Sequence, residues 1–170
     1  MQRIAKFSKV SWEQFKKDWV DTFGDVTEDK IKEIYDNIKL PKRATVMSAG
    51  HDISIPFDTS IKNGEIVKIP TGIRCKMDDG YVMFVFPRSS MGIKKGMVIC
   101  NTIPVIDGDY FGADNEGHIK IKITNDSKEN KVLEISAGDK IAQGIFVPFG
   151  ITVDDTADGV RTGGIGSTGK

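Results

Sequence analysis

The stretch HIKIKIT, residues 118–124, decides the fold class. Within it Ile119, Ile121 and Ile123 alternate with Lys120 and Lys122. A period of two is typical of a β-strand with one buried face and one solvated face. The pattern therefore predicts a strand whose isoleucines point into a core and whose lysines point outward.

Similar short runs follow one another after Thr45, and Gly, Asp, Asn and Pro residues separate them. These runs are EIVKIP (65–70), GIRCKM (72–77), YVMFVF (81–86), MVIC (97–100), KVLEIS (131–136) and IAQGIFVPF (141–149). Several short strands with no helical pattern between them predict a mainly β body, a barrel or sandwich of jelly-roll type.

The chain has a different character before Pro41, where two helical patterns lie. Ser11 can cap the first helix, Gln14 stands at the capping-box position, and Gly24 is a typical C-terminal stop. The apolar residues Trp12, Phe15, Trp19, Val20 and Phe23 share one face of this helix.

The second helix is expected to begin after Thr27 and to end at Pro41, with its apolar face formed by Ile31, Ile34, Tyr35 and Ile38. Two amphipathic helices need a surface to pack on. We therefore expect residues 1–40 to form a helical lobe docked on a β body of residues 41–153. The polar, glycine-rich residues 154–170 are predicted to form a mobile arm.

Composition favours an ordinary globular protein of one domain. The 170 residues are 28% charged and 39% hydrophobic, and the formal net charge is zero, which gives no basic footprint for nucleic acid. The longest apolar run, Tyr81–Phe86, is too short to cross a membrane, and the first residues lack the apolar core of a signal peptide. Cys75 and Cys100 are expected to be reduced core thiols. These features predict a cytoplasmic protein.

Polar or glycine-rich clusters interrupt the β body, and each one alone has two interpretations. In PRSSMG (87–92), Arg88 and Ser89 could belong to a plain turn or could bind a phosphate. Asp107 is either a turn former or a positioned base. Gln143 interrupts an apolar run, so its amide needs partners and could face a site. The segment around Gly138 is expected to be a structural turn.

The chain ends on RTGGIGSTGK (161–170), in which Gly164, Gly169 and Lys170 fit most of a P-loop. A P-loop needs a helix after it, with the phosphates at the helix N-terminus. The sequence has no such helix, so the tail needs another explanation.

Five clusters, taken in order, resemble the motifs of the homotrimeric deoxyuridine triphosphatases, the dUTPases. They read AGHDIS, PRSSMG, NTIPVIDGDY, GDKIAQ and RTGGIGSTG, and the resemblance spans Leu40–Gly169. It implies a distorted jelly-roll-like β-barrel, here with an N-terminal helical extension, in a homotrimer with shared sites. It also implies Mg²⁺-dependent hydrolysis of dUTP to dUMP and pyrophosphate by water attack on the α-phosphorus. This reaction limits uracil incorporation into DNA and supplies dUMP for dTMP synthesis.

The resemblance implies a role for each matching residue on the nucleoside side of the site. Asp107 matches the carboxylate that activates the attacking water. Tyr110 matches the aromatic ring that packs on deoxyribose and excludes a 2′-hydroxyl. Asn101 matches the amide that reads the uracil edge, together with backbone groups near Val105 and Ile106.

On the phosphate side, Arg88, Ser89, Ser90 and Gln143 match phosphate-contacting residues, and Asp52 matches a carboxylate that acts near Mg²⁺ through water. The arm that closes over the triphosphate is matched by Arg161, Gly164, Ile165, Gly166, Ser167 and Thr168. The glycines of such an arm would let backbone N–H groups surround phosphate oxygens.

This sequence departs from the family pattern at His51, Pro104 and Ile165, and FGADNEGH (111–118) lengthens a loop at the site mouth. Ile165 stands where an aromatic residue usually stacks on the base. We expect either Ile165 or Phe111 to cover the base instead.

Two other functions remain as alternatives. A dCTP deaminase shares the fold but needs a catalytic glutamate where this chain has Lys122, and a lysine cannot do that work at neutral pH. A regulatory dUTPase would bind a protein partner, with the helical lobe as a candidate surface.

Overall fold

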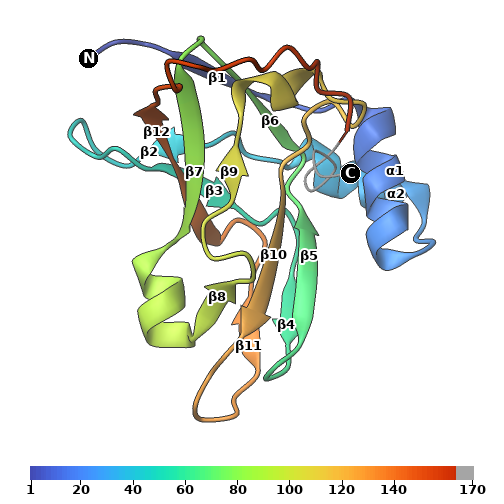
Figure 1. Ribbon diagram of the computed structural model, residues 1–170. Coiled ribbons are helices and arrows are strands. Elements are labelled where there is room, and N and C mark those ends of the chain that lie inside the picture. The colour runs from blue at the N-terminus through green and yellow to red at the C-terminus, as the bar shows by residue number, and fades with distance from the viewer. Residues whose placement is uncertain (164–170) are drawn as a thin grey trace.

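The computed structural model describes residues 1–163 and is mainly β (Figure 1). Its helical elements are α1 (Trp12–Phe23), α2 (Glu28–Asp36), the π-helical turn η1 (Ser90–Lys94) and the 3-10 turn η2 (Gly108–Gly112). Its strands are β1 (Ala5–Lys9), β2 (Lys42–Arg43), β3 (His51–Ser54), β4 (Thr59–Ile61), β5 (Ile66–Pro70), β6 (Ile73–Met77), β7 (Tyr81–Pro87), β8 (Met97–Ile99), β9 (Val105–Ile106), β10 (Lys120–Asn125), β11 (Leu133–Ile135) and β12 (Lys140–Pro148).

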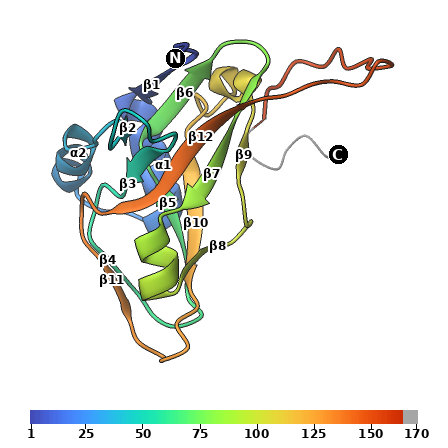
Figure 2. The ribbon, with the colours of Figure 1, turned by 90° about the vertical axis from the view of Figure 1, so that its left-hand side faces the viewer.

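The strands form four antiparallel sheets around one core, which confirms the predicted jelly-roll-like barrel. The largest sheet has the order β2-β3-β12-β7-β9, a second has the order β5-β10-β8, and β1-β6 and β11-β4 pair separately. Figures 1 and 2 show these sheets wrapped around a shared interior, with the helical lobe on one side. Within residues 1–163, no helix combines the length and the apolar character that crossing a membrane requires.

Strand β10 confirms the alternation from which the fold was predicted. Ile119, Ile121 and Ile123 are each at most 1% exposed. β10 pairs with β5 on one side and with β8 on the other, so it lies in the middle of its sheet. The buried isoleucines therefore join this sheet to the common core of the barrel.

Helix α1 begins and ends as predicted, but its capping box is formed differently. The Ser11 hydroxyl accepts a hydrogen bond from the Gln14 backbone N–H at 3.1 Å, and Gly24 ends the helix with φ +76°. The Gln14 side chain does not reach back to the Ser11 N–H, as a capping box requires. Glu116 takes that place and accepts from the Ser11 N–H at 2.7 Å.

Helix α2 is shorter than predicted, because it ends at Asp36 and not at Pro41. The chain between them buries Ile38 against the barrel, where the side chain fills the space beside Gly72. A Cβ on Gly72 would lie 2.1 Å from Ile38 Cδ1, and Gly72 has φ +71°. Phe15 and Trp19 of α1 belong to the same core. Residues from the apolar faces of both helical patterns therefore belong to the common core.

Strand β1 was not predicted, because its five residues mix charged and apolar types. It pairs in an antiparallel register with β6, from Ala5 opposite Met77 to Lys9 opposite Ile73. Both cysteines are free in the described chain. Cys75 is buried, and burial raises the pKa of its thiol to about 12. Cys100 is exposed, so its prediction as a core thiol was wrong.

The lowered pKa values of the two histidines predict that the free energy of unfolding decreases in acid. Burial lowers the pKa of His118, although Asp18 opposes the shift, and burial also lowers the pKa of His51. Unfolded histidine has a pKa of about 6.5. The stabilisation is therefore complete above about pH 6.5 and is lost as the pH falls toward the lowered values, by at most ~1.4 kcal/mol per pH unit and group.

We expect a lower urea midpoint at pH 5.5 than at pH 7.5, and a smaller difference in His118→Gln. His51→Gln should reduce the difference in the same way. Equal midpoints for the wild-type protein at the two pH values would contradict this prediction.

Candidate functional site

The predicted phosphate-binding residues lie together where β12 runs between β3 and β7. Gln143 stands opposite Asp52 on one neighbouring strand and opposite Phe86 on the other. The Gln143 amide donates to the Pro87 carbonyl at 3.4 Å. Gly50 leaves room for it, because a Cβ on Gly50 would lie 2.2 Å from Gln143 Oε1.

Asp52 is the electrostatic centre of this first cluster. Its residue is 6% exposed, and its two carboxylate oxygens form ion pairs with Arg88 at 2.9 Å and with Lys140 at 2.8 Å. Neither contact has the geometry of a hydrogen bond. Arg88 nevertheless stays one-third exposed at its side chain, so the guanidinium has N–H groups left for an anion.

The two predicted serines follow at the surface. Ser89 precedes η1 and Ser90 begins it, and both are exposed. The turn is held by hydrogen bonds from the N–H groups of Met91 and Gly92 to the Arg88 carbonyl. Arg88 and the two hydroxyl groups therefore face solvent from one end of β7.

A second cluster of predicted residues lies around η2. Asp107 occupies the position before this turn, with its side chain about half exposed. Arg161 contacts Asp107 Oδ2 at 2.8 Å and Asp109 Oδ1 at 3.3 Å, and its guanidinium lies 5.0 Å from the centre of the Tyr110 ring. Arg161 is only 9% exposed at its side chain although it belongs to the C-terminal arm.

The arm is held at this point by a backbone contact as well. The Asp114 N–H donates to the Thr162 carbonyl at 3.0 Å. Figure 2 shows the preceding segment, after β12, reaching out from the barrel before the chain returns. The predicted residues Gly164, Ile165, Gly166, Ser167 and Thr168 lie outside the described residues.

A cavity of about 500 Å³ opens beside the second cluster. Its wall includes Asn101, Tyr110 and Asn115, together with the lysines Lys68, Lys120 and Lys122. The Asn101 loop is tightly turned, since Thr102 has φ +62° and the Ile103 N–H donates to the Asn101 carbonyl at 2.7 Å. The structure thus brings the predicted base-reading amide and sugar-facing ring to one cavity.

The backbone near the cavity is fixed by β9. Val105 and Ile106 pair with Phe84 and Met83 of β7, which leaves Val105 half exposed and Ile106 buried. Pro104 is also buried, and its carbonyl accepts from the Val85 N–H at 3.0 Å.

One chain does not bring the two clusters together, because they lie at opposite ends of β7. Ile106 pairs with Met83, five residues before Arg88. At about 3.3 Å per residue, this leaves about 16 Å of extended strand between them, and Asp107 lies beyond Ile106. In Figure 1, η2 lies near the top of β7 and the turn that follows Arg88 lies near the bottom.

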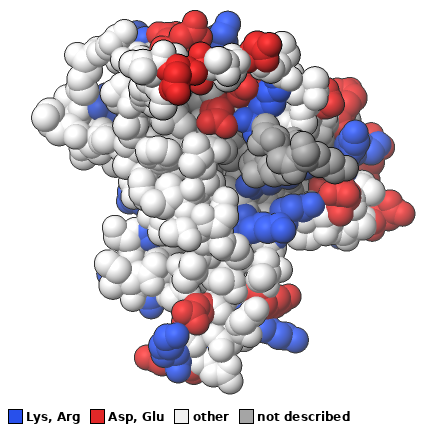
Figure 3. Space-filling model, in the orientation of Figure 1, with Lys and Arg blue, Asp and Glu red and all other residues white. Residues whose placement is uncertain are grey.

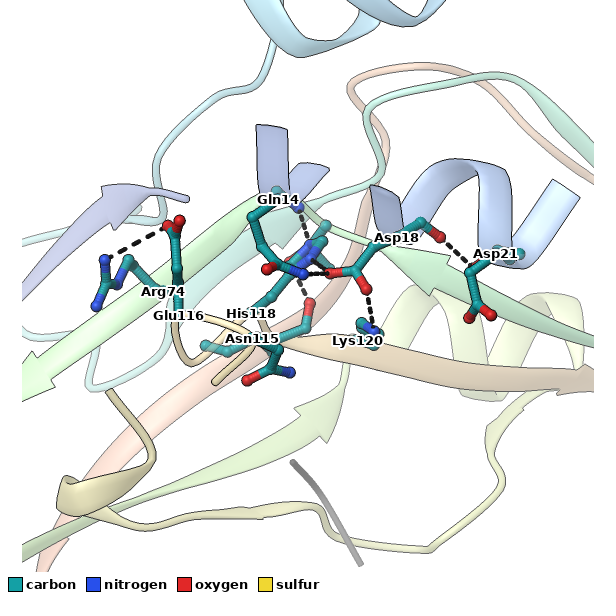
Figure 4. A network of polar contacts seen from close by, with 12 residues as sticks. Gln14, Asp18, Asp21, Arg74, Asn115, Glu116, His118 and Lys120 are labelled. Atoms are coloured by element: carbon teal, nitrogen blue, oxygen red, sulfur yellow. Dashed lines mark hydrogen bonds and ion pairs between the residues drawn. The ribbon is translucent and has the colours of Figure 1, made fainter. Parts of the chain in front are cut away.

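Sequence patterns missed the polar network behind the cavity (Figure 4). The Tyr110 hydroxyl donates to the His118 carbonyl at 2.7 Å and accepts from the Asn115 amide at 2.8 Å. His118 is fully buried, and its Nδ1 lies 2.5 Å from the Asp18 carboxylate of α1. The signal available was weak, since only the lengthened loop of residues 111–118 marked this place.

The described residues do not form a cage for a metal ion. Within residues 1–163, no three His, Cys, Asp or Glu side chains are grouped so that they could hold one. Asp52 is the residue expected to act near Mg²⁺ through water. Its two carboxylate oxygens form ion pairs with Arg88 and Lys140. A metal ion at this site would therefore depend on ligand oxygens for most of its coordination.

Comparison with known proteins gives one consistent result. The family model described as dUTPase matches residues 36–169. The deoxyuridine 5′-triphosphate nucleotidohydrolase of Lactococcus lactis subsp. lactis is 43% identical over 135 residues, which cover 78% of this chain and 89% of the relative.

Solved structures agree with the sequence comparison. The dUTPase of Streptococcus mutans is 41% identical, with a TM-score of 0.62, and the match covers 69% of this chain and 90% of the other. A dUTPase of phage phi11 of S. aureus, described with a structural Mg(II) ion, shares the fold with a TM-score of 0.60 at 22% identity. That match covers 75% of this chain and 94% of the phage protein.

The ion pairs of Arg161 predict how the arm is held. Arg161→Gln removes the charge that faces Asp107 and Asp109, so residues 159–163 should detach from η2. We expect faster amide hydrogen exchange in this segment than in the wild-type protein. Asp158→Asn is the matched control, because Asp158 is exposed and has no ion pair among the described residues. Unchanged exchange in Arg161→Gln would show that other contacts hold the arm.

Proposed function

This chain belongs to the dUTPase family and is an enzyme that hydrolyses dUTP, and we propose that water attacks the α-phosphorus to release dUMP and pyrophosphate. In this reaction a new P–O bond forms to the water oxygen, and the bond from the α-phosphorus to the bridging oxygen breaks. The proposed role in the cell is to limit uracil incorporation into DNA and to supply dUMP for dTMP synthesis, in the cytoplasm.

The observation that carries the proposal is the content of the two clusters. One presents a partly exposed arginine, two hydroxyl groups and an amide, which are groups that bind phosphate oxygens. The other presents a half-exposed carboxylate beside a cavity with an amide and a tyrosine ring. Together these groups fit a phosphorylated nucleoside and a water nucleophile.

In the proposed mechanism Asp107 orients the attacking water and takes its proton. General base catalysis contributes roughly 10²–10⁴-fold to the rate. The Tyr110 ring faces the deoxyribose and leaves no room for a 2′-hydroxyl. Asn101 and the backbone near Val105 and Ile106 read the uracil edge, and cytosine would leave these groups unpaired.

Arg88, Ser89, Ser90 and Gln143 bind the phosphate chain in this proposal. Arg161 would exchange Asp107 for phosphate oxygens when the arm closes, and Gly164, Ile165, Gly166, Ser167 and Thr168 would complete the closure. This exchange would free the Asp107 carboxylate for the water. Positioning and charge stabilisation supply the rest of the rate acceleration.

Mg²⁺ is proposed as the cofactor, and when bound with the substrate it would neutralise charge on the triphosphate. The dUTPase of phage phi11 was described with a structural Mg(II) ion. It is 22% identical to this chain, so the comparison shows a shared fold only. Asp52 is proposed to act near the ion through water. The main proposed role of Asp52 is to hold the Arg88 guanidinium in place.

We also propose a homotrimer whose sites are shared between subunits. The distance along β7 separates Arg88 from Asp107 within one chain, and this separation supports the proposal that a second copy completes the site. Figure 3 shows a face on which charged side chains lie mostly at the top, right and bottom, while the middle and left are largely uncharged. Exposed apolar side chains of η1, β8, β9 and the loop between β8 and β9 are Ile93, Val98, Val105 and Ile103. Exposed apolar side chains support the proposal that this part of the surface contacts another copy.

The alternative of a dCTP deaminase is disfavoured by the cavity itself. Lys122 lines the wall beside Asn101 and Tyr110. An ammonium group donates hydrogen bonds and does not accept them, so it cannot replace a catalytic carboxylate.

Asp107→Asn tests the proposed base. The amide keeps the size of the side chain but cannot take a proton, so turnover of dUTP should fall by at least ~100-fold while dUTP still binds. Pyrophosphate release gives the rate, and calorimetry with a nonhydrolysable analogue gives the affinity. If the variant turns over within about tenfold of the wild type, another group is the base.

Mixed subunits test whether sites are shared. Arg88→Ala and Asp107→Asn should each be nearly inactive alone. When the two variants are unfolded together and refolded, some sites should combine an intact Arg88 with an intact Asp107 from another chain. We expect activity to return in the mixture, with a trimeric mass by light scattering. A monomeric mass, or a mixture no more active than its components, would contradict the shared site.

A further inference from the structure

We propose that helix α1 is a clamp that positions the Tyr110 ring and thereby sets the rejection of ribonucleotides. The clamp acts on the loop of residues 111–118, which carries both partners of the Tyr110 hydroxyl. The inference rests on the proposed function, in which Tyr110 faces the sugar. It assigns a role to the N-terminal lobe, most of which lies outside the region that matches the family model.

The Tyr110 ring is oriented by its hydroxyl. The hydroxyl donates to the His118 carbonyl at 2.7 Å and accepts from the Asn115 amide at 2.8 Å. Both partners belong to the loop that follows η2, so the ring can keep its position only if this loop keeps its shape. Tyr110 and Asn115 also line the same cavity.

The loop has a backbone shape that needs support. Glu116 has φ +57°, which is unfavourable for a residue with a side chain, and Gly117 follows with φ +67°. A Cβ on Gly117 would lie 2.6 Å from the Tyr110 carbonyl oxygen, so the loop folds closely over the backbone of Tyr110 itself. Strained segments of this kind persist where surrounding contacts determine them.

The first contact of the clamp joins the start of α1 to the strained residue. Glu116 Oε1 accepts from the Ser11 hydroxyl at 2.6 Å, and Glu116 Oε2 accepts from the Ser11 N–H at 2.7 Å. Arg74 supports the loop from β6, since it donates to the Phe111 carbonyl at 2.6 Å and lies 3.6 Å from Glu116 Oε2. The cap of α1 and the loop therefore share one hydrogen-bond network.

The second contact comes from the middle of α1. Asp18 Oδ2 accepts from Gln14 at 2.8 Å and pairs with His118 Nδ1 at 2.5 Å (Figure 4). His118 Nε2 accepts from the Gly72 N–H at 2.8 Å, which makes Nδ1 the protonated nitrogen of a neutral ring. The imidazole of His118 therefore bridges α1 and the barrel. The backbone carbonyl of the same residue accepts the hydrogen bond from the Tyr110 hydroxyl.

The same carboxylate reaches the wall of the cavity. Asp18 Oδ1 binds Lys120 Nζ at 2.6 Å, and Asp21 of the same helix binds Lys68 Nζ at 2.9 Å. Burial alone would raise the pKa of Asp18, but the hydrogen bonds from His118, Lys120 and Gln14 outweigh it and hold the pKa below its ordinary value. Asp18 is thus a fixed anion and a positioning residue, which touches no substrate itself.

A positioning role differs from a purely structural one in its effect on selectivity. Rejection of a 2′-hydroxyl by contact requires a ring that cannot move aside. If the clamp is weakened, the ring gains freedom, UTP enters, and dUTP keeps its other contacts. A merely structural role would lower activity toward both nucleotides in the same proportion.

The test compares kcat and KM for dUTP and UTP in full-length Asp18→Asn, Ser11→Ala and Glu116→Ala, since Glu116 binds Ser11 and does not line the cavity. We expect the ratio of kcat/KM for dUTP to that for UTP to fall at least about tenfold, mainly through better use of UTP, while kcat for dUTP changes less than about threefold. Glu28→Gln is the control, because it breaks an exposed ion pair of the lobe with Lys16, away from the loop. It should keep the wild-type ratio.

Each result decides one way. A lowered ratio in the clamp variants, with the control unchanged, supports the proposal. An unchanged ratio in the variants that fold, as judged by circular dichroism, overturns it, and Ser11→Ala and Glu116→Ala provide this readout if Asp18→Asn does not fold. A wild-type protein that does not hydrolyse dUTP would refute the proposed function instead, so the two failures are distinguishable.

Discussion

The antiparallel pairing of β7 is the constraint on which the rest of the site depends. This strand pairs with β12 on one side and β9 on the other. Pairing with β12 places Arg88 beside Gln143 and Asp52, and pairing with β9 places Asp107 at the opposite end. A strand is stiff and its length is fixed by its rise per residue, so β7 holds the two clusters apart within one chain. The proposal that a second copy completes the site rests on this separation.

A buried carboxylate gives the N-terminal lobe its fixed place on the barrel. An ionised group removed from water must be paired and hydrogen-bonded. Asp18 satisfies this requirement with partners from its own helix and from the barrel, namely Gln14, His118 and Lys120. Any displacement of α1 would separate this charge from its two barrel partners, His118 and Lys120. The apolar residues Phe15 and Trp19 bury their side chains against the barrel, while the Asp18 carboxylate fixes the position of α1 along it.

Local patterns predicted much of the fold and part of the site. The alternation in residues 118–124 and the apolar runs after Thr45 identified β5, β6, β7, β8, β10, β11 and β12, since periodicity and apolar runs are local features of the sequence. The short or mixed strands β1, β2, β3, β4 and β9 were missed, because long-range pairing and not periodicity defines them. The motifs grouped Arg88 with Ser89 and Asp107 with Tyr110. They did not show which of these groups lie at the same end of the barrel, because strand register determines that. Gln143 was correctly singled out as an amide in an apolar run that needs a partner.

The lysines of β10 show why the contacts between the helical lobe and this strand were not predicted from the sequence. Alternation shows which face of a strand points away from the core, but it does not show what covers that face. Lys120 therefore has the pattern of a solvated residue, although it meets Asp18 of α1, while Lys122 remains exposed two residues later. His118 continues the same outward row and is completely buried, because the lobe covers that end of the sheet. The Nδ1 of the buried His118 finds its partner in a carboxylate a hundred residues earlier in the chain, a relation that no local pattern contains.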